Sequence, residues 1–193
     1  NYHCPSSLQE AESLYAKSED PMFLAGGHTL LPTMKQRLNA PTDLIDLAGL
    51  TELAGISREG DVLQIGAYTR HADVAASELV QTAIPALAKL ARGIGDTQVR
   101  NRGTIGGSVA NNDPAADYPA ALLGLGATVV TTKRSVPADE FFVDMFETVL
   151  EEGEIITAVT FPVKGDAEYI KFANPASRYA TVGVFINRHN DGV

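Results

Sequence analysis

Two glycine-rich segments constrain this chain more than any other feature, because each of them lies between segments of apolar residues. The first is Leu-Ala-Gly-Gly-His-Thr-Leu-Leu-Pro, at residues 24–32. The apolar residues 22–25 indicate a buried strand, and residues 30–38 have the pattern of a short helix. Glycine permits positive φ and lets a ligand approach the backbone closely. The N–H groups of Gly27, His28, Thr29 and Leu30 are therefore expected to converge as an anion-binding site.

The alternative for this first segment is a plain strand-to-helix turn, which is the favoured interpretation when the segment is taken alone. The segment is not a P-loop, since no Lys-Ser/Thr follows at the required spacing. It does not match the GxGxxG fingerprint either.

The second glycine-rich segment spans residues 100–112, within a stretch 93–112 that is rich in Gly, Asn and Arg and shows no helical period. We expect an irregular loop here. Backbone donors at Gly106, Gly107 and Ser108 are expected to reach phosphate, and Thr104 and Asn111 to hydrogen-bond ribose or phosphate. A surface loop made of turn-forming residues is an equally good interpretation of this motif alone.

Asp117 lies two residues before Pro119, which is expected to open a helix. From the residues alone, an N-cap is favoured over a carboxylate that accepts hydrogen bonds from sugar or ribityl hydroxyls. Two glycine segments that each suit a phosphate point to a ligand with two phosphates, such as an extended dinucleotide. No catalytic triad or carboxylate pair stands out, so no catalytic residue is assigned and a cofactor is expected to carry the chemistry.

Composition excludes several classes of protein. The chain has 193 residues, 45% hydrophobic, with a formal net charge of −9, which disfavours a nucleic-acid-binding surface. Cys4 is the only cysteine, so this chain alone holds no disulfide, no cysteine-based zinc site and no iron–sulfur cluster. The four histidines show no paired metal spacing, so no metal site is expected. No apolar stretch approaches a membrane span, and the polar start leads us to expect a cytoplasmic protein, here as a fragment.

Helices and strands alternate irregularly, which indicates an α+β fold rather than a wound parallel sheet. Ser7 and Glu10 match a capping box at the start of the first helix. The expected helices span residues 7–17, 30–38, 69 or 71 to 79, 85–92 and 119–125, and the expected strands residues 22–25, 43–47, 62–65, 128–132, 154–161, 169–172 and 181–186.

Three motifs in one order resemble a known family: AGGHTLLP at 25–32, IGAYTRH at 65–71 and RNRGTIGGSVANNDPAADYPA at 100–120. The chain resembles the FAD-binding domain of the molybdopterin dehydrogenases, most of all the medium, flavoprotein subunit of carbon monoxide dehydrogenase-type molybdenum hydroxylases. The resemblance implies an α+β, two-subdomain FAD-binding domain of the PCMH-like type. It divides the chain into a first subdomain at 1–48, a second at 49–186, and the start of a missing C-terminal domain at 187–193.

The resemblance also implies a set of cofactor-binding residues. The two glycine segments hold the FAD pyrophosphate from two sides, Asp117 contacts FAD hydroxyls, Ile156 and Lys171 lie beside the isoalloxazine, and Tyr179 lies near the flavin ring. The segment 173–178 departs from the basic pattern usual before that tyrosine. The full set is Leu24, Ala25, Gly26, Gly27, His28, Thr29, Leu30, Gly103, Thr104, Ile105, Gly106, Gly107, Ser108, Asn111, Asp117, Ile156, Lys171 and Tyr179.

By the same resemblance, FAD takes electrons from [2Fe–2S] clusters on a small partner subunit and passes them to an external acceptor, a quinone or NAD⁺. The molybdenum cofactor belongs to a large partner subunit. FAD is expected to bind without a covalent link, since Cys4 is far in sequence from both glycine segments. Two alternatives stay open: the flavin subunit of a hydroxylase for xanthine, aldehyde or aromatic substrates, and a nucleotide-binding or assembly module with no role in electron transfer.

Overall fold

The computed structural model describes residues 1–188, and residues 189–193 lie outside the described part. The N-terminal part is a three-stranded parallel sheet with the strand order β1-β3-β2, flanked by two helices. Its elements are β1 (Tyr2–His3), α1 (Leu8–Lys17), β2 (Pro21–Leu24), α2 (Leu30–Lys35) and β3 (Asp43–Asp46). The expected order of helix, strand, glycine loop, helix and strand is confirmed, with β1 as an addition.

Local sequence signals explain where these elements begin and end. Ser7 caps α1, because its hydroxyl accepts a hydrogen bond from the N–H of Glu10 at 3.2 Å. The Glu10 carboxylate returns to the N–H of Ser6 at 2.8 Å, one residue earlier than a standard capping box. Helix α2 ends earlier than expected, since Arg37 has left-handed backbone geometry with φ 60°.

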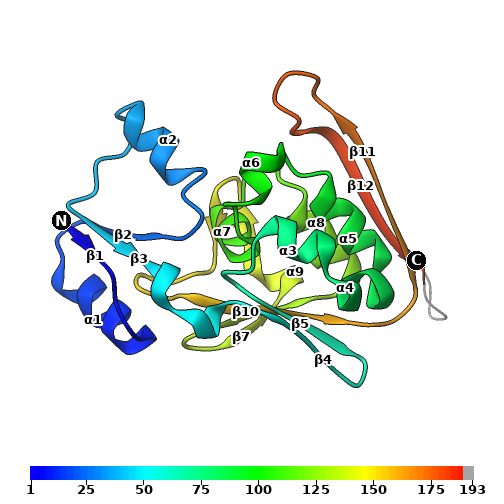
Figure 1. Ribbon diagram of the computed structural model, residues 1–193, viewed down its shortest axis with the longest axis horizontal. Helices are drawn as coiled ribbons and strands as arrows, with labels where there is room; N and C mark the ends of the chain where they lie inside the picture. Colours follow the sequence, from blue (N-terminus) through cyan, green and yellow to red (C-terminus); the bar gives the residue numbers. More distant parts are fainter. Residues whose placement is uncertain (189–193) are drawn as a thin grey trace.

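The second part is built on a five-stranded antiparallel sheet with the order β4-β5-β10-β6-β7. Figure 1 shows the helices of this part gathered beside that sheet, and the larger hydrophobic core lies between them. The strands are β4 (Ile56–Glu59), β5 (Val62–Gly66), β6 (Thr128–Thr131), β7 (Ser135–Pro137) and β10 (Ile156–Pro162), and the helices are α3 (His71–Ala76), α4 (Glu78–Ala83), α5 (Pro85–Arg92), α6 (Thr97–Arg100), α7 (Ile105–Asn111), α8 (Tyr118–Leu125) and α9 (Ala138–Phe141).

Most of the expected helices are present, with one division. The single helix expected up to residue 79 is two helices, because Ser77 ends α3 and its hydroxyl caps α4. Helix α5 begins at Pro85 as expected, and α8 ends at Gly126, whose φ of 62° is left-handed. Two short 3-10 helices, η1 (Leu47–Gly49) and η2 (Thr51–Leu53), join the N-terminal sheet to the second part. The division after residue 48 falls within η1 and stays a prediction.

The irregular loop expected at residues 93–112 is wrong, because this stretch contains helices α6 and α7. Glycine costs about 1 kcal/mol in a helix and leaves no side chain to show a period. Here tertiary packing overrides that cost. A Cβ on Gly106 would lie 2.6 Å from the Cβ of Ala67, so only glycine lets α7 approach the 65–69 turn this closely. Thr104 then caps the helix by accepting from the N–H of Gly107 at 3.2 Å.

The chain then forms two hairpins. The short one pairs β8 (Phe142–Asp144) with β9 (Glu147–Thr148), and the long one pairs β11 (Asp166–Ala173) with β12 (Ala180–Arg188). The long hairpin extends along the helices in Figure 1. Its inner face packs on α5 and α8, whereas its outer face carries the exposed side chains of Ile170, Phe172, Val182, Val184 and Ile186. No helix within residues 1–188 has the length and apolar character needed to span a membrane.

Candidate functional site

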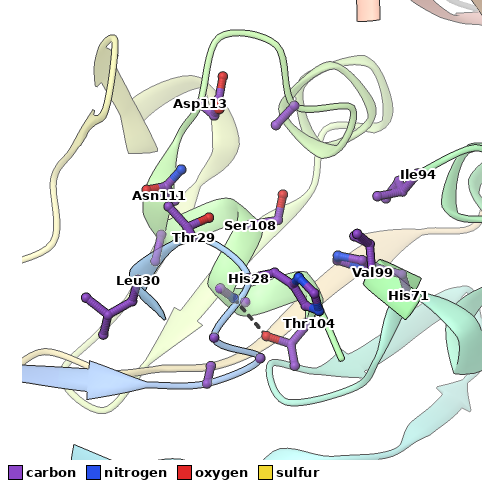
Figure 2. Close-up of a pocket in the computed structure, with 18 of the residues that line it drawn as sticks. His28, Thr29, Leu30, His71, Ile94, Val99, Thr104, Ser108, Asn111 and Asp113 are labelled. Carbon is purple, nitrogen blue, oxygen red and sulfur yellow. Dashed lines mark hydrogen bonds between the residues drawn. The ribbon is translucent and has the colours of Figure 1, made fainter. Parts of the chain in front are cut away.

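A cavity of about 820 Å³ lies between the N-terminal sheet and the helices of the second part. Its volume falls in the range of roughly 300–1,000 Å³ that is usual for small-molecule and cofactor sites. Both glycine segments line it, together with Asp117, Ile156 and Tyr179. Figure 2 shows side chains from both segments arranged around this space. The structure thus brings together residues that are far apart in the sequence.

Three of the eighteen expected cofactor-binding residues do not line the cavity: Leu24, Ile105 and Lys171. Leu24 is the last residue of β2, and Ile105 is fully buried in the larger core. Lys171 lies behind the cavity wall, where it contacts Asp117. The roles of all eighteen residues towards FAD stay predictions.

The first glycine segment leaves its backbone donors free. Within residues 1–188, the N–H groups of Gly27, His28, Thr29 and Leu30 donate no hydrogen bond to the protein. Gly27 has a φ of 74°, which only glycine adopts easily, and this geometry turns the chain from β2 towards α2. All four residues line the cavity. Free N–H groups at such a turn suit an anionic ligand, as the sequence predicts.

The two glycine segments touch one another directly. A Cβ on Gly26 would lie 2.7 Å from the Cα of Gly103, closer than real Cβ contacts allow. The Tyr68 hydroxyl adds a long hydrogen bond to the carbonyl oxygen of Ala25, at 3.4 Å. Glycine at position 26 is therefore required by the close approach of the two segments. Tyr68 belongs to one of the family motifs, yet sequence reasoning did not select it.

At the second segment the expectation of free backbone donors is wrong. Helix α7 directs its first N–H groups at acceptors inside the protein. The N–H of Gly106 donates to the carbonyl oxygen of Ala67 at 2.8 Å, and that of Ser108 to the carbonyl oxygen of Thr104 at 3.1 Å. The N–H of Gly107 donates to the Thr104 hydroxyl, as the dashed line in Figure 2 shows. Ser108 and Asn111 are polar side chains that this segment brings to the cavity, and its glycines line the cavity with backbone atoms.

Asp117 occupies the N-cap position of helix α8 as expected, but its side chain makes no capping hydrogen bond, so the capping role that the residues alone favour is wrong. Its carboxylate accepts a hydrogen bond from the Tyr169 hydroxyl at 2.5 Å and from Lys171 Nζ at 2.9 Å. Lys171 also donates to the carbonyl oxygen of Gly93 at 3.2 Å. Burial, together with the hydrogen bond to Asp117, raises the pKa of Tyr169. Asp117 is 5% exposed and reaches the cavity wall, so it forms both a structural contact and a candidate ligand contact.

His71 is a further cavity residue that sequence reasoning missed. It is 5% exposed, and its Nδ1 atom has no hydrogen-bond partner. Burial lowers the pKa of His71 to about 4, helped by the charges of His28 and Arg100. The imidazole is therefore neutral at pH 7. His71 is the last residue of the 65–71 motif and could have been noticed there. No other residue of that motif indicates a role for an imidazole.

Two strained turns border the cavity. Phe146, in the turn of the short hairpin, has a φ of 58° and is 61% exposed. Asn112, itself left-handed, holds this turn through side-chain hydrogen bonds to the carbonyl oxygens of Asp144 and Glu147. The second turn joins β11 to β12, and Arg178 has a φ of 62° there.

Tyr179 follows the β11–β12 turn and lines the cavity with 49% of its surface exposed. The atypical segment before it is a compact turn, in which the Asn174 side chain accepts from the N–H groups of Ala176 and Ser177 at 2.9 and 3.1 Å. Burial and the nearby Asp113 and Asp117 charges raise the pKa of Tyr179. The described residues contain no cluster of His, Cys, Asp and Glu side chains able to hold a metal ion.

Comparison with known proteins identifies this arrangement. Residues 1–164 match the family described as the FAD binding domain in molybdopterin dehydrogenase. The chain is 40% identical to the carbon monoxide dehydrogenase medium chain of Hydrogenophaga pseudoflava over 199 aligned residues, which cover 99% of this chain and 69% of that one. The chain therefore belongs to the FAD-binding domain family of the molybdopterin dehydrogenases, which are oxidoreductases.

Solved structures agree with this assignment. The structure of carbon monoxide dehydrogenase from Hydrogenophaga pseudoflava superimposes with a TM-score of 0.90 and 42% identity, covering 95% of this chain and 67% of that one. Quinoline 2-oxidoreductase from Pseudomonas putida 86 gives a TM-score of 0.91 and 35% identity, covering 95% and 66%. The α+β, PCMH-like fold and the binding of FAD are thus confirmed. The chain spans about two thirds of the length of these relatives.

Proposed function

We propose that this chain is the flavin-bearing medium subunit of a molybdenum hydroxylase complex of the carbon monoxide dehydrogenase type. Its FAD takes electrons from [2Fe–2S] clusters on a small partner subunit and passes them to an external acceptor, a quinone or NAD⁺. A large partner subunit carries the molybdenum cofactor. The likeness to a carbon monoxide dehydrogenase medium chain supports this role, and a chain with one cysteine leaves the clusters to a partner.

The observation that carries the proposal is the meeting of two glycine segments at one cavity. Bound FAD supplies a group that accepts electrons singly and releases them in pairs. The free N–H groups of residues 27–30 bind its pyrophosphate, and the Ser108 and Asn111 side chains contact it from α7. Asp117 accepts from a cofactor hydroxyl, whereas Ile156 and Tyr179 lie at the isoalloxazine ring.

Three further features belong to this proposal. FAD is held without a covalent bond, so denaturing the loaded protein in acid releases all the flavin into the supernatant. The protein works in the cytoplasm. The chain divides into subdomains at residues 1–48 and 49–186. Of the segment 187–193, the first two residues belong to β12 and the rest lie outside the described residues.

Flavin reduction within the complete complex tests the function. Carbon monoxide is added to the assembled complex without oxygen, and we expect the flavin absorption band to bleach. The same FAD-loaded chain without its partner subunits is the control and should stay oxidised. Bleaching by a purine, an aldehyde or an aromatic N-heterocycle, but not by carbon monoxide, favours the alternative hydroxylase. A loaded complex whose flavin stays oxidised with every substrate contradicts an electron-transfer role.

A further inference from the structure

Tyr169 is a buried tyrosine outside the residue set derived from the family motifs. It lies in β11 and is 4% exposed, with its ring on the inner face of the long hairpin. Its hydroxyl donates to Asp117 Oδ1 at 2.5 Å, across 52 residues of sequence. Tyr169 does not line the cavity, so any effect it has on the cofactor passes through another residue.

The surroundings of Tyr169 hold its ring in one place. Phe185 is its direct cross-strand neighbour, with the ring centroids 6.0 Å apart. A Cβ on Gly183 would lie 2.5 Å from the Tyr169 hydroxyl and 3.3 Å from its Cζ atom. The absence of a side chain at Gly183 therefore makes room for the phenol. Gly124 of α8 in turn admits Phe185, since a Cβ there would lie 2.8 Å from Cδ1 of that ring. Two glycines thus seat the aromatic pair between the hairpin and α8.

The Asp117 carboxylate is consequently held at both oxygens. Tyr169 occupies Oδ1 and Lys171 occupies Oδ2, the latter at 2.9 Å. An ionised carboxylate has about four acceptor positions, so two donors from the protein leave acceptor capacity for a ligand. Asp117 reaches the cavity wall while Tyr169 and Lys171 do not. The two donors therefore fix the orientation of the carboxylate, and its remaining acceptor positions stay available to a ligand in the cavity.

We propose that Tyr169 is a positioning residue for FAD, which orients the Asp117 carboxylate to accept a hydrogen bond from a cofactor hydroxyl. This inference rests on the proposed function, because it requires Asp117 to contact FAD. Preorganisation of this kind strengthens binding, because the side chain is already ordered and FAD binding does not incur the entropy cost of ordering it. The hydroxyl of Tyr169, rather than its ring, is the part that matters for the cofactor.

Tyr118 provides a matched control for this hydroxyl. It is fully buried, follows Asp117 directly in the chain, and its hydroxyl has no hydrogen-bond partner. Tyr169→Phe and Tyr118→Phe therefore remove the same atom from two buried tyrosines, and only the hydroxyl of Tyr169 is hydrogen-bonded to Asp117. Neither change creates a large cavity, so both variants are expected to fold.

The test measures the FAD dissociation constant by flavin titration of apoprotein prepared from each loaded variant of the full protein. We expect Tyr169→Phe to weaken FAD about tenfold, the effect of one ordinary hydrogen bond, and Tyr118→Phe to change it less than about twofold. In an Asp117→Ala background, Tyr169→Phe should cause no further loss, since coupled residues are not additive. Unchanged affinity in Tyr169→Phe, or an undiminished loss in the Asp117→Ala background, overturns the inference.

A second variant approaches the same hydroxyl from the opposite strand. Gly183→Ala places a methyl group against the Tyr169 hydroxyl while Asp117 and Lys171, the cross-strand neighbour of Gly183, keep their side chains, and it should also weaken FAD. Normal affinity in both Gly183→Ala and Tyr169→Phe contradicts the positioning role but leaves the proposed function intact. Normal affinity in Asp117→Ala removes Asp117 from the cofactor contacts and the inference with it. Wild-type protein that binds no FAD contradicts the proposed function itself.

Discussion

Lys171 Nζ lies 2.9 Å from Asp117 Oδ2, and the two side chains are only 10% and 5% exposed. This ion pair joins β11 of the long hairpin to the N-terminal end of α8, directly behind the cavity wall. A buried ion pair adds little to the stability of the fold compared with an apolar replacement of both residues. Removal of one partner, however, is strongly destabilising, because it leaves the other charge buried without compensation. The pair therefore makes the cavity wall sensitive to single substitutions.

Asp117→Ala is expected to destabilise the apoprotein by about 3 kcal/mol or more, because Lys171 and the Tyr169 hydroxyl lose their acceptor. It should also weaken FAD by roughly 10- to 150-fold, the range for a lost charge-assisted hydrogen bond of about 1.5–3 kcal/mol. Urea unfolding of the apoprotein and flavin titration measure the two effects. Asp96→Ala is the benchmark, since Asp96 does cap α6 and a lost cap costs about 1 kcal/mol. Equal destabilisation by the two changes would contradict the buried-pair interpretation.

Gly107→Val is expected to abolish FAD binding while the domain stays folded. A Cβ at this position lies 2.9 Å from the Thr104 hydroxyl and 3.7 Å from the Cβ of Ala25, so a branched side chain enters the space between the two glycine segments. Valine has at least the helix propensity of glycine, which limits the cost to α7. Flavin titration and thermal unfolding separate the two effects, and Gly107→Ala should be intermediate. Near-normal affinity in folded Gly107→Val would remove Gly107 from the site.

The sequence is most informative where a signal is local. The Ser7 cap, the Pro85 start of α5 and the left-handed Gly126 after α8 each act within a few residues of their own position. Most of the predicted cofactor-binding residues also line the cavity, because they fall in contiguous motifs. Helix α7 is not predicted, since its glycines show no helical period and the residue that packs against Gly106, Ala67, lies far back in the chain.

The same reason explains why the role of Asp117 was misjudged. Its partners Tyr169 and Lys171 lie 52 and 54 residues further along the chain. No local pattern connects a helix start with a strand so distant, so the N-cap preference of aspartate was the better local interpretation. Only the docking of the long hairpin against α8 gives the carboxylate its donors. The residues around Asp117 do not by themselves indicate such tertiary contacts.

His71 should make the apoprotein sensitive to mild acid. Its folded-state pKa of about 4 lies below the ordinary value of about 6.5, so between these values the unfolded chain binds a proton that the folded protein does not. The free energy of unfolding therefore decreases as the pH falls through this window, by about 1.4 kcal/mol per pH unit and about 3 kcal/mol in total. Above about pH 6.5 this penalty is absent.

His71→Gln should flatten the pH dependence between about pH 6.5 and 4, because the amide does not titrate. Urea unfolding of the apoprotein at several pH values in this window measures the difference from wild type. His28→Gln should keep most of the wild-type slope, because burial, and not the charge of His28, is the larger cause of the lowered pKa of His71. If His71→Gln follows the wild-type pH dependence, His71 does not carry the acid sensitivity.

Tyr179→Ala is expected to change the surroundings of the flavin ring without loosening the pyrophosphate. Tyr179 lines the cavity from the end of the β11–β12 turn, and neither glycine segment is altered by its removal. FAD affinity should therefore change by less than about tenfold, or ~1.4 kcal/mol. The flavin absorption band should shift, and reoxidation by a small acceptor should become faster, since Tyr179 lines the cavity and its removal opens that side of the cavity.

Stopped-flow reoxidation of the dithionite-reduced protein measures this change, with wild type beside the variant. Tyr2→Ala serves as the control, because Tyr2 is an exposed tyrosine of β1 that does not line the cavity. A faster rate in Tyr179→Ala alone identifies the tyrosine as a barrier between the flavin and its acceptor. The compact turn held by Asn174 would then set the position of that barrier, since Tyr179 follows it directly and its carbonyl oxygen accepts from the N–H of Asn174 at 2.8 Å. Identical spectra and identical rates would place Tyr179 away from the flavin, as an ordinary half-buried residue at a strand end.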